Sequence, residues 1–253
     1  MKKIEENKLL ISGQISLSNF CVLDVVGDSE KALDFLQGQV TSDLSVLQNN
    51  HYQLSAICNQ KGQVIADIIV KKVSNEFKII VDKTLKDIFI QDLEPYAKFF
   101  RVSFKETAEV VHGFVGETKS IHPLIDNHGL FISIDIDDKA LIDSISHDEW
   151  LASNIMVGNY LLTQKESGQF RPSEINYDKK RVSFNKGCFR GQEIIARMKY
   201  LGKETPTFHV LFSDKEINFS NLKKIKVLLG LKVNNTYMKA CIAKQDIIDE
   251  LID

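Results

Sequence analysis

Cysteine is scarce in this sequence, and no two cysteines lie close together. The chain contains four, with no Cys-x-x-Cys pair among them. Zinc ions and iron-sulfur clusters need ligands at short spacings, so we expect no metal site. We interpret three of the four as small, half-buried apolar side chains in a reducing compartment. These three are Cys21, Cys58 and Cys241, and the fourth is Cys188.

The sequence also lacks a long apolar run and a surplus of positive charge. No apolar stretch approaches the length of a membrane span, and residues 1–8 contain acids but no signal-peptide apolar core. We therefore expect a cytoplasmic protein with no membrane partner. A net charge of −2 argues against bulk nucleic-acid binding. A length of 253 residues is enough to bury a sizeable core in two or three domains.

The greatest density of reactive groups lies in residues 185–197, termed here the signature segment. It holds a thiol, three cations, two glycines and an amide next to a carboxylate. Lys186 and Arg190 flank Cys188 at two residues on either side, which predicts that the three side chains share one surface. Nearby positive charge and a helix N-terminus both favour the thiolate, so Lys186 or Arg190 would activate Cys188.

The signature segment also suits a flat ligand. Gly187 and Gly191 would close a turn that lets the backbone approach a ligand, and a helix is predicted from Gln192 to residue 201. Gln192 and Glu193 offer the hydrogen bonds that an aminopyrimidine ring such as a pterin needs.

A simpler interpretation exists, and spacing alone favours it. Cys188 would be a packed core thiol, Lys186 and Arg190 would be solvated, and Gln192 and Glu193 would only favour the helix start. A local basic patch that binds an anionic tail is a further interpretation of the same region. Its members would be Lys179, Lys180, Arg181, Lys186, Arg190, Arg197, Lys199 and Lys203.

Three segments carry a resemblance to a known family. Lys-Gly-Cys-Phe-x-Gly-Gln-Glu at residues 186–193 resembles the signature of the YgfZ family of folate-binding proteins, relatives of the glycine-cleavage T-protein, an aminomethyltransferase. Phe-Leu-Gln-Gly-Gln-x-Thr-x-Asp at residues 35–43 and Phe-x-Pro-x-Glu-x-Asn at residues 170–176 are also similar to family segments. The resemblance runs in order from residue 20 to about residue 203.

The resemblance implies a function. The chain would bind tetrahydrofolate and support the assembly or repair of iron-sulfur proteins, including tRNA-modifying enzymes. Cys188 would be the essential thiol, with Lys186 beside it. Iron-sulfur enzymes or assembly factors would be its partners, and we expect a monomer. The folate site or its entrance would be formed by Gly187, Arg190, Gly191, Gln192, Glu193 and Arg197.

Asp67 raises an alternative function. It lies on a predicted strand between Ile65 and Ile69, and T-proteins have a similar strand whose aspartate serves folate chemistry. This chain has only one of the two acids of that strand. The resemblance therefore admits a folate-dependent aminomethyltransferase or demethylase with Asp67 in the catalytic set. An ion pair between Asp67 and a lysine at a sheet edge is an equal alternative. A third hypothesis is a scaffold that docks a partner through the basic stretch and uses folate as a structural ligand.

Hydrophobic periodicity predicts an α+β fold. With the resemblance, we expect a T-protein-like fold of antiparallel sheets with packed helices in ferredoxin-like halves. Too few residues follow Gly202 for a closed barrel, so we expect a short, incomplete one. A helix from Thr84 is predicted to end at Leu93, before Pro95. The expected domains are residues 1–45 with 108–203, an inserted domain of residues 46–107, and a barrel-like domain of residues 204–253.

Overall fold

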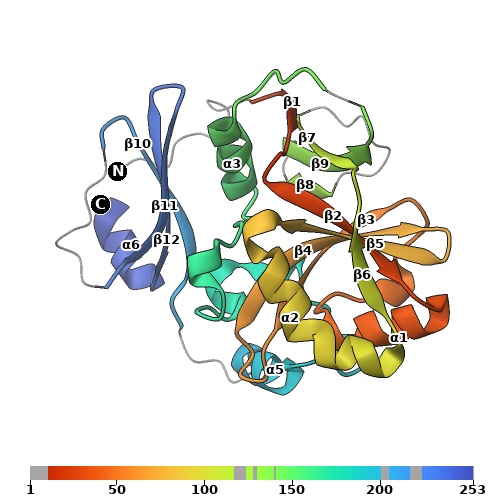
Figure 1. Cartoon of the computed structure of the whole chain (residues 1–253). Coiled ribbons are helices and arrows are strands. Elements are labelled where there is room, and N and C mark those ends of the chain that lie inside the picture. Colours follow the sequence, from red (N-terminus) through yellow and green to blue (C-terminus); the bar gives the residue numbers. More distant parts are fainter. Residues whose placement is uncertain are drawn as a thin grey trace.

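Three antiparallel sheets, with helices packed on them, make up the described part of the chain (Figure 1). The computed structural model describes residues 11–116, 124–127, 130–139, 141–200, 205–216 and 224–252. The strands are β1 (Gly13–Ser16), β2 (Phe20–Val26), β3 (Tyr52–Cys58), β4 (Val64–Val73), β5 (Glu76–Asp82), β6 (Ser103–Glu106), β7 (Val110–Val115), β8 (Ile125–Asn127), β9 (Leu130–Asp137), β10 (Thr207–Ser213), β11 (Lys226–Val233) and β12 (Thr236–Ala243). The helices are α1 (Ser29–Gln39), α2 (Lys83–Phe100), α3 (His147–Met156), α4 (Tyr177–Lys180), α5 (Gln192–Tyr200) and α6 (Gln245–Ile252), with 3-10 turns η2 (Leu44–Val46), η3 (Gln164–Glu166) and η4 (Pro172–Ile175).

The central sheet has five strands in the order β3-β4-β5-β2-β6 and is buried on both faces. Successive residues of a strand point to opposite faces, so one strand serves two cores. Leu23 belongs to the core that α1 and α2 cover, whereas Val22 belongs to the core shared with α3 and the second sheet. Ile79 and Ile80 of β5 divide in the same way. This double burial explains the apolar runs within β2, β4 and β5, whereas β6 at the edge of the sheet is mostly exposed.

The other two sheets complete the fold around this one. The second sheet has the order β1-β7-β9-β8, and the third, C-terminal sheet has the order β10-β12-β11 with α6 packed against it. Phe208 of β10 packs against both main cores, and its ring lies 5.9 Å from that of Tyr160. The α+β class with antiparallel sheets is confirmed, and the C-terminal sheet has three strands followed by α6.

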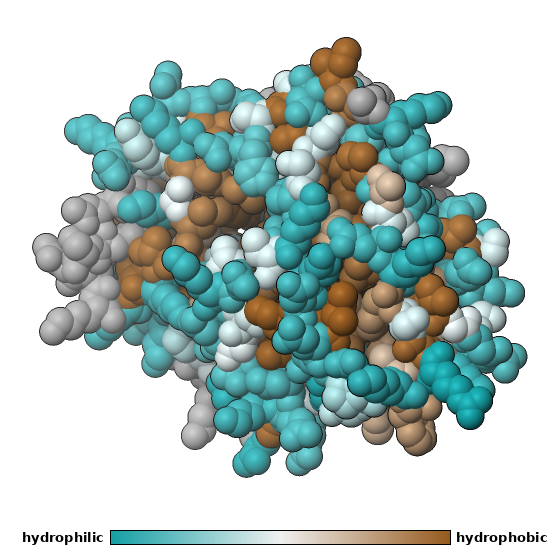
Figure 2. Space-filling view, in the orientation of Figure 1, coloured by the Kyte–Doolittle hydropathy of each residue, from teal (hydrophilic) through white to brown (hydrophobic). Residues whose placement is uncertain are grey.

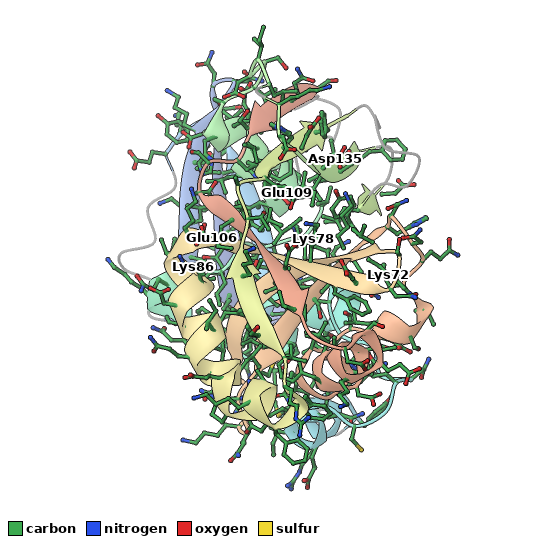
Figure 3. All side chains as sticks on the ribbon, turned by 45° about the vertical axis from the view of Figure 1, so that its right-hand side comes forward. Lys72, Lys78, Lys86, Glu106, Glu109 and Asp135 are labelled. Carbon is green, nitrogen blue, oxygen red and sulfur yellow. The ribbon has the colours of Figure 1, made fainter. Side chains whose placement is uncertain are left out.

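Charged side chains join the first two sheets on one side of the molecule. The ammonium of Lys78 lies 2.7 Å from Asp24 and 2.7 Å from Glu109, which directly precedes β7. Lys71 of β4 lies 3.7 Å from Asp135 of β9. Figure 3 shows Lys78 and Glu109 close together where the two sheets meet. Because these charges satisfy one another, we interpret them as structural rather than as a binding surface.

The prediction that a helix ends before Pro95 is wrong, because α2 continues to Phe100. A proline inside a helix has no N–H for the carbonyl four residues earlier, here that of Gln91. Both residues are exposed, whereas Leu93 and Ala97 are buried in the core. Burial of these apolar side chains therefore outweighs the lost hydrogen bond.

The domain boundaries expected from the sequence stay a prediction. The sheets group the described strands in a different pattern from those boundaries. Strand β2, which precedes residue 46, pairs with β5 and β6 inside the central sheet. Residues on both sides of the expected insertion boundary therefore share one sheet.

Candidate functional site

Lys186 points into the protein rather than toward solvent. Its side-chain ammonium donates to the carbonyl oxygens of Val40 at 2.8 Å and of Ser42 at 2.7 Å. The residue is only 8% exposed. Burial lowers the pKa of the Lys186 ammonium to about 8, and the nearby Asp43 acts in the opposite direction. The two carbonyls supply the acceptors that a buried ammonium needs.

More hydrogen bonds join the same two parts of the chain. The hydroxyl of Thr41 donates to the carbonyl of Arg181 at 2.6 Å, and the amide of Ser183 donates to the carbonyl of Thr41 at 2.9 Å. The amide of Arg190 donates to the carbonyl of Gly38 at 3.1 Å. These contacts and those of Lys186 are termed here the junction between residues 38–42 and 181–190. They fix the start of the signature segment to the end of α1.

The junction is in turn tied to the central sheet. The amide of Thr41 donates to the carbonyl of Ala56 in β3 at 2.9 Å, and the Thr41 hydroxyl accepts from the amide of Ala56 at 3.0 Å. The Ser42 hydroxyl lies 2.8 Å from that of Ser55. Thr41 and Ser55 are fully buried. The signature segment thus rests on the sheet through residues 40–42.

Cys188 is exposed, whereas the side chains of Lys186 and Arg190 bind other parts of the chain. Lys186 takes the carbonyls of the junction, and Arg190 forms an ion pair with Asp92 of α2. The guanidinium of Arg190 also lies 5.3 Å from the ring centre of Tyr96. The prediction that Lys186, Cys188 and Arg190 share one surface is therefore wrong, because Lys186 and Arg190 bind acceptors in different parts of the fold. The simpler interpretation of Cys188 as a core thiol is also wrong.

The turn between β3 and β4 supports the start of α5. Gly191 has a φ of +81°, and a Cβ there would lie 2.5 Å from the carbonyl oxygen of Asn59. Gly62 has a φ of +70°, and its Cβ would lie 3.2 Å from the side chains of both Ile194 and Ile195. Figure 1 shows this turn meeting α5 below α2. The two glycines let two backbone turns touch, which sets the direction in which α5 leaves the signature segment.

The remaining predicted ligand residues lie on α5. Gln192 is half-buried, whereas Glu193 and Arg197 are exposed. Neither Glu193 nor Arg197 forms an ion pair with another residue in the part of the chain that the structure describes. Gly187 is exposed, and a Cβ on it would meet nothing within 4 Å. Among the described residues, the carboxylate of Glu193 is therefore exposed and without an ion-pair partner.

Asp67 is buried in an ion pair with Arg181. One guanidinium nitrogen of Arg181 lies 3.4 Å from the Asp67 carboxylate and 2.9 Å from the side-chain oxygen of Asn159. Arg181 also donates to the carbonyls of Ser55 and Ile68. Burial raises the pKa of the Asp67 carboxyl, and the Arg181 guanidinium opposes this rise. The ion-pair alternative is therefore correct in kind, but the partner is an arginine and the place is the core.

The predicted basic patch loses several of its members. Arg181 and Lys186 are buried, and Arg190 is paired with Asp92. Lys199 is exposed, and its ammonium lies 3.5 Å from the ring centre of Phe184. Lys203 lies outside the described residues. Within the described ranges, no group of three or more His, Cys, Asp or Glu side chains could hold a metal ion.

Sequence reasoning missed several residues that build this region. The sequence indicates Thr41 only as part of the segment of residues 35–43, and it gives no sign of a role for Asp92 or Tyr96. Their partners lie about a hundred or more residues away along the chain, and hydrophobic periodicity carries no signal for such pairs. The similarity of residues 35–43 to a family segment was the one signal that pointed to Thr41.

The lowered pKa of Lys186 predicts how the free energy of unfolding changes with pH. Its pKa is about 8 in the folded protein and 10.5 ordinarily. Between these values the unfolded chain holds a proton that the folded chain has released, so the free energy of unfolding rises with pH. We expect the difference in unfolding free energy between wild type and Lys186→Met to increase across this window, measured by urea unfolding at a series of pH values. A difference that stays constant would contradict the assignment.

Gly191 and Gly187 allow a matched comparison, because only one of them contacts the rest of the protein closely. Gly191→Ala forces a side chain against the Asn59 carbonyl at an unfavourable φ and should lower the free energy of unfolding by about 1–3 kcal/mol. Gly187→Ala meets no atom and should change it by less than about 0.5 kcal/mol. Urea unfolding measures both, and equal effects would show that α5 does not rest on the β3–β4 turn.

Comparisons with known proteins show which family the chain belongs to. No family model matches the chain. An uncharacterized protein from Haemophilus influenzae is 34% identical over 198 residues, which cover 74% of this chain and 69% of that protein. The tRNA-modifying protein YgfZ of Klebsiella pneumoniae is 27% identical over 224 residues, covering 74% and 68% of the two chains. YgfZ of Buchnera aphidicola is 27% identical over 238 residues, covering 80% and 74%.

A solved structure has the same fold. The glycine cleavage system aminomethyltransferase T from Bartonella henselae superposes with a TM-score of 0.69 over 94% of this chain and 80% of that one, at 13% sequence identity. The sequence relatives place the chain in the YgfZ family, and the solved structure shows that its fold is T-protein-like.

Proposed function

We propose that this chain binds tetrahydrofolate and supports the assembly or repair of iron-sulfur proteins, including tRNA-modifying enzymes, through the thiol of Cys188. The observation that carries the proposal is an exposed cysteine on a segment whose neighbours are fixed by the junction. Thiolates react with metals and electrophiles only where these can reach them. A surface thiol on a rigid support can meet a partner protein without any rearrangement of the core.

The residues of α5 fit a pterin. The carboxylate of Glu193 is exposed and has no ion-pair partner among the described residues, so it can accept two parallel N–H bonds. The side chain of Gln192 lies one position before it and is half-buried. The pterin would supply the matching donors and a flat apolar face.

The hydrophobic hollow on the surface lies away from α5. Figure 2 shows a hollow with hydrophobic residues around it, between the C-terminal sheet and the rest of the molecule below α3. Because α5 lies at the bottom of the same view in Figure 1, well below α3, this hollow is not assigned to the pterin contacts of Glu193. No helix in the described ranges is both long and apolar enough to cross a membrane.

The aminomethyltransferase alternative is not favoured. A catalytic acid must reach the proton that it transfers. The Asp67 side chain is 8% exposed and is held by Arg181, which is 1% exposed. This arrangement supports a structural role for Asp67, as a charge that orients Arg181 between β3 and β4.

A titration of the purified protein with tetrahydrofolate, under anaerobic and reducing conditions, tests the folate site. We expect micromolar binding by calorimetry and at least about tenfold weaker binding by Glu193→Ala, because charge-assisted hydrogen bonds are lost. Glu30→Ala is the matched control, since Glu30 is also an acid in the first turn of a helix and is exposed. A folded wild-type protein that does not bind, or equal loss in both variants, would rule out the site.

The role of the thiol is tested separately. Because the Cys188 side chain is exposed, Cys188→Ala should leave the unfolding free energy within about 0.5 kcal/mol of wild type. Folate affinity should also be unchanged. The variant should nevertheless fail to complement a strain that lacks the gene. Full complementation would show that the thiol is not needed, even if the folate titration succeeds.

A further inference from the structure

A second pocket lies on the side of the signature segment that faces α2. It has a volume of about 530 Å³ and is bounded by α2, the turn between β3 and β4, and Arg190. It contains neither Glu193 nor Gln192, so it is separate from the residues assigned to the pterin. Its volume falls within the range of small-molecule sites.

The pocket carries a net positive charge. Lys61 in the turn is exposed and forms no ion pair within the described ranges, and Arg190 is balanced by Asp92. The Nε–H of Arg190 is buried and has no acceptor among the described residues. A buried donor without a partner is unfavourable, and the side chain that carries it also lines the pocket. Lys61 and Arg190 together suit an anion such as a phosphate.

One wall of the pocket is flat and rich in hydrogen-bonding groups. The guanidinium of Arg190 lies 5.3 Å from the ring centre of Tyr96, and Pro95, the residue before Tyr96, also lines the pocket. Pro95 has no N–H, so the carbonyl of Gln91 lacks its usual helical donor. The amides of Gln60 and Gln91 add a donor and an acceptor each. A planar ligand with mixed donors and acceptors on its edge matches this wall.

We propose that this pocket binds a nucleoside monophosphate, either free or as one nucleotide of single-stranded RNA. The phosphate lies at Lys61 and Arg190, the base lies against Tyr96 and Pro95, and the amides of the pocket contact the edge of the base. Bases stack on aromatic and guanidinium planes, and phosphates take the cations. An acidic peptide would use the cations only and leave the flat wall without a partner.

Amide NMR of the full chain tests this proposal with AMP, adenosine and inorganic phosphate as separate probes. We expect saturable shifts around the β3–β4 turn and α2 with AMP, at a Kd below about 1 mM. Adenosine and phosphate alone should each bind at least about tenfold more weakly, because each lacks half of the contacts. A short single-stranded oligoadenylate distinguishes the sources: tighter binding than AMP indicates RNA, and equal binding indicates a free nucleotide.

Variants locate the site. Lys61→Glu should weaken AMP binding by at least about tenfold, whereas Lys31→Glu, an identical charge change on the exposed surface of α1, should not alter it. Tyr96→Leu should reduce adenosine binding while phosphate binding is kept. The proposal is overturned by an absence of shifts at about 10 mM AMP, by shifts elsewhere only, by equal affinity of Lys61→Glu and wild type, or by phosphate binding as tightly as AMP.

Discussion

The junction between residues 38–42 and 181–190 is the constraint on which the rest of the site depends. It combines a buried ammonium on two carbonyls with backbone bonds from Ser183 and Arg190. Removing one partner of such a set leaves buried polar groups unsatisfied, which is more unfavourable than the net value of each bond. The junction therefore holds or is lost as a unit. It also joins two family-like segments that lie far apart in the sequence.

The junction separates the roles that the signature segment combines in sequence. Lys186 is a structural anchor, Arg190 forms a wall of a second pocket, and Cys188 is presented to solvent. The glycine contact at Gly191 then directs α5, which carries the exposed Glu193. Within one short stretch, Lys186 therefore points to the core, Arg190 to α2 and Cys188 to the solvent. Motif residues adjacent in sequence need not act on the same ligand.

Much of the fold could be predicted from the sequence, because local signals decide it. The α+β class and the helix that begins at Gln192 are both predicted from local patterns. The site was less predictable. Whether Lys186 faces solvent depends on carbonyls more than a hundred residues away, which no local pattern encodes. The continuation of α2 past Pro95 is likewise a result of tertiary burial that overrides local preference.

Native-state hydrogen exchange tests the junction most directly. The amides of Ser183 and Arg190 lie in a loop by sequence but donate across the junction, whereas those of Thr41 and Ala56 are tied to the central sheet. If the junction is one unit, all four exchange only through the same large opening, with similar protection. Rapid exchange of Ser183 and Arg190 beside protected Thr41 and Ala56 would show that the junction does not hold the signature segment.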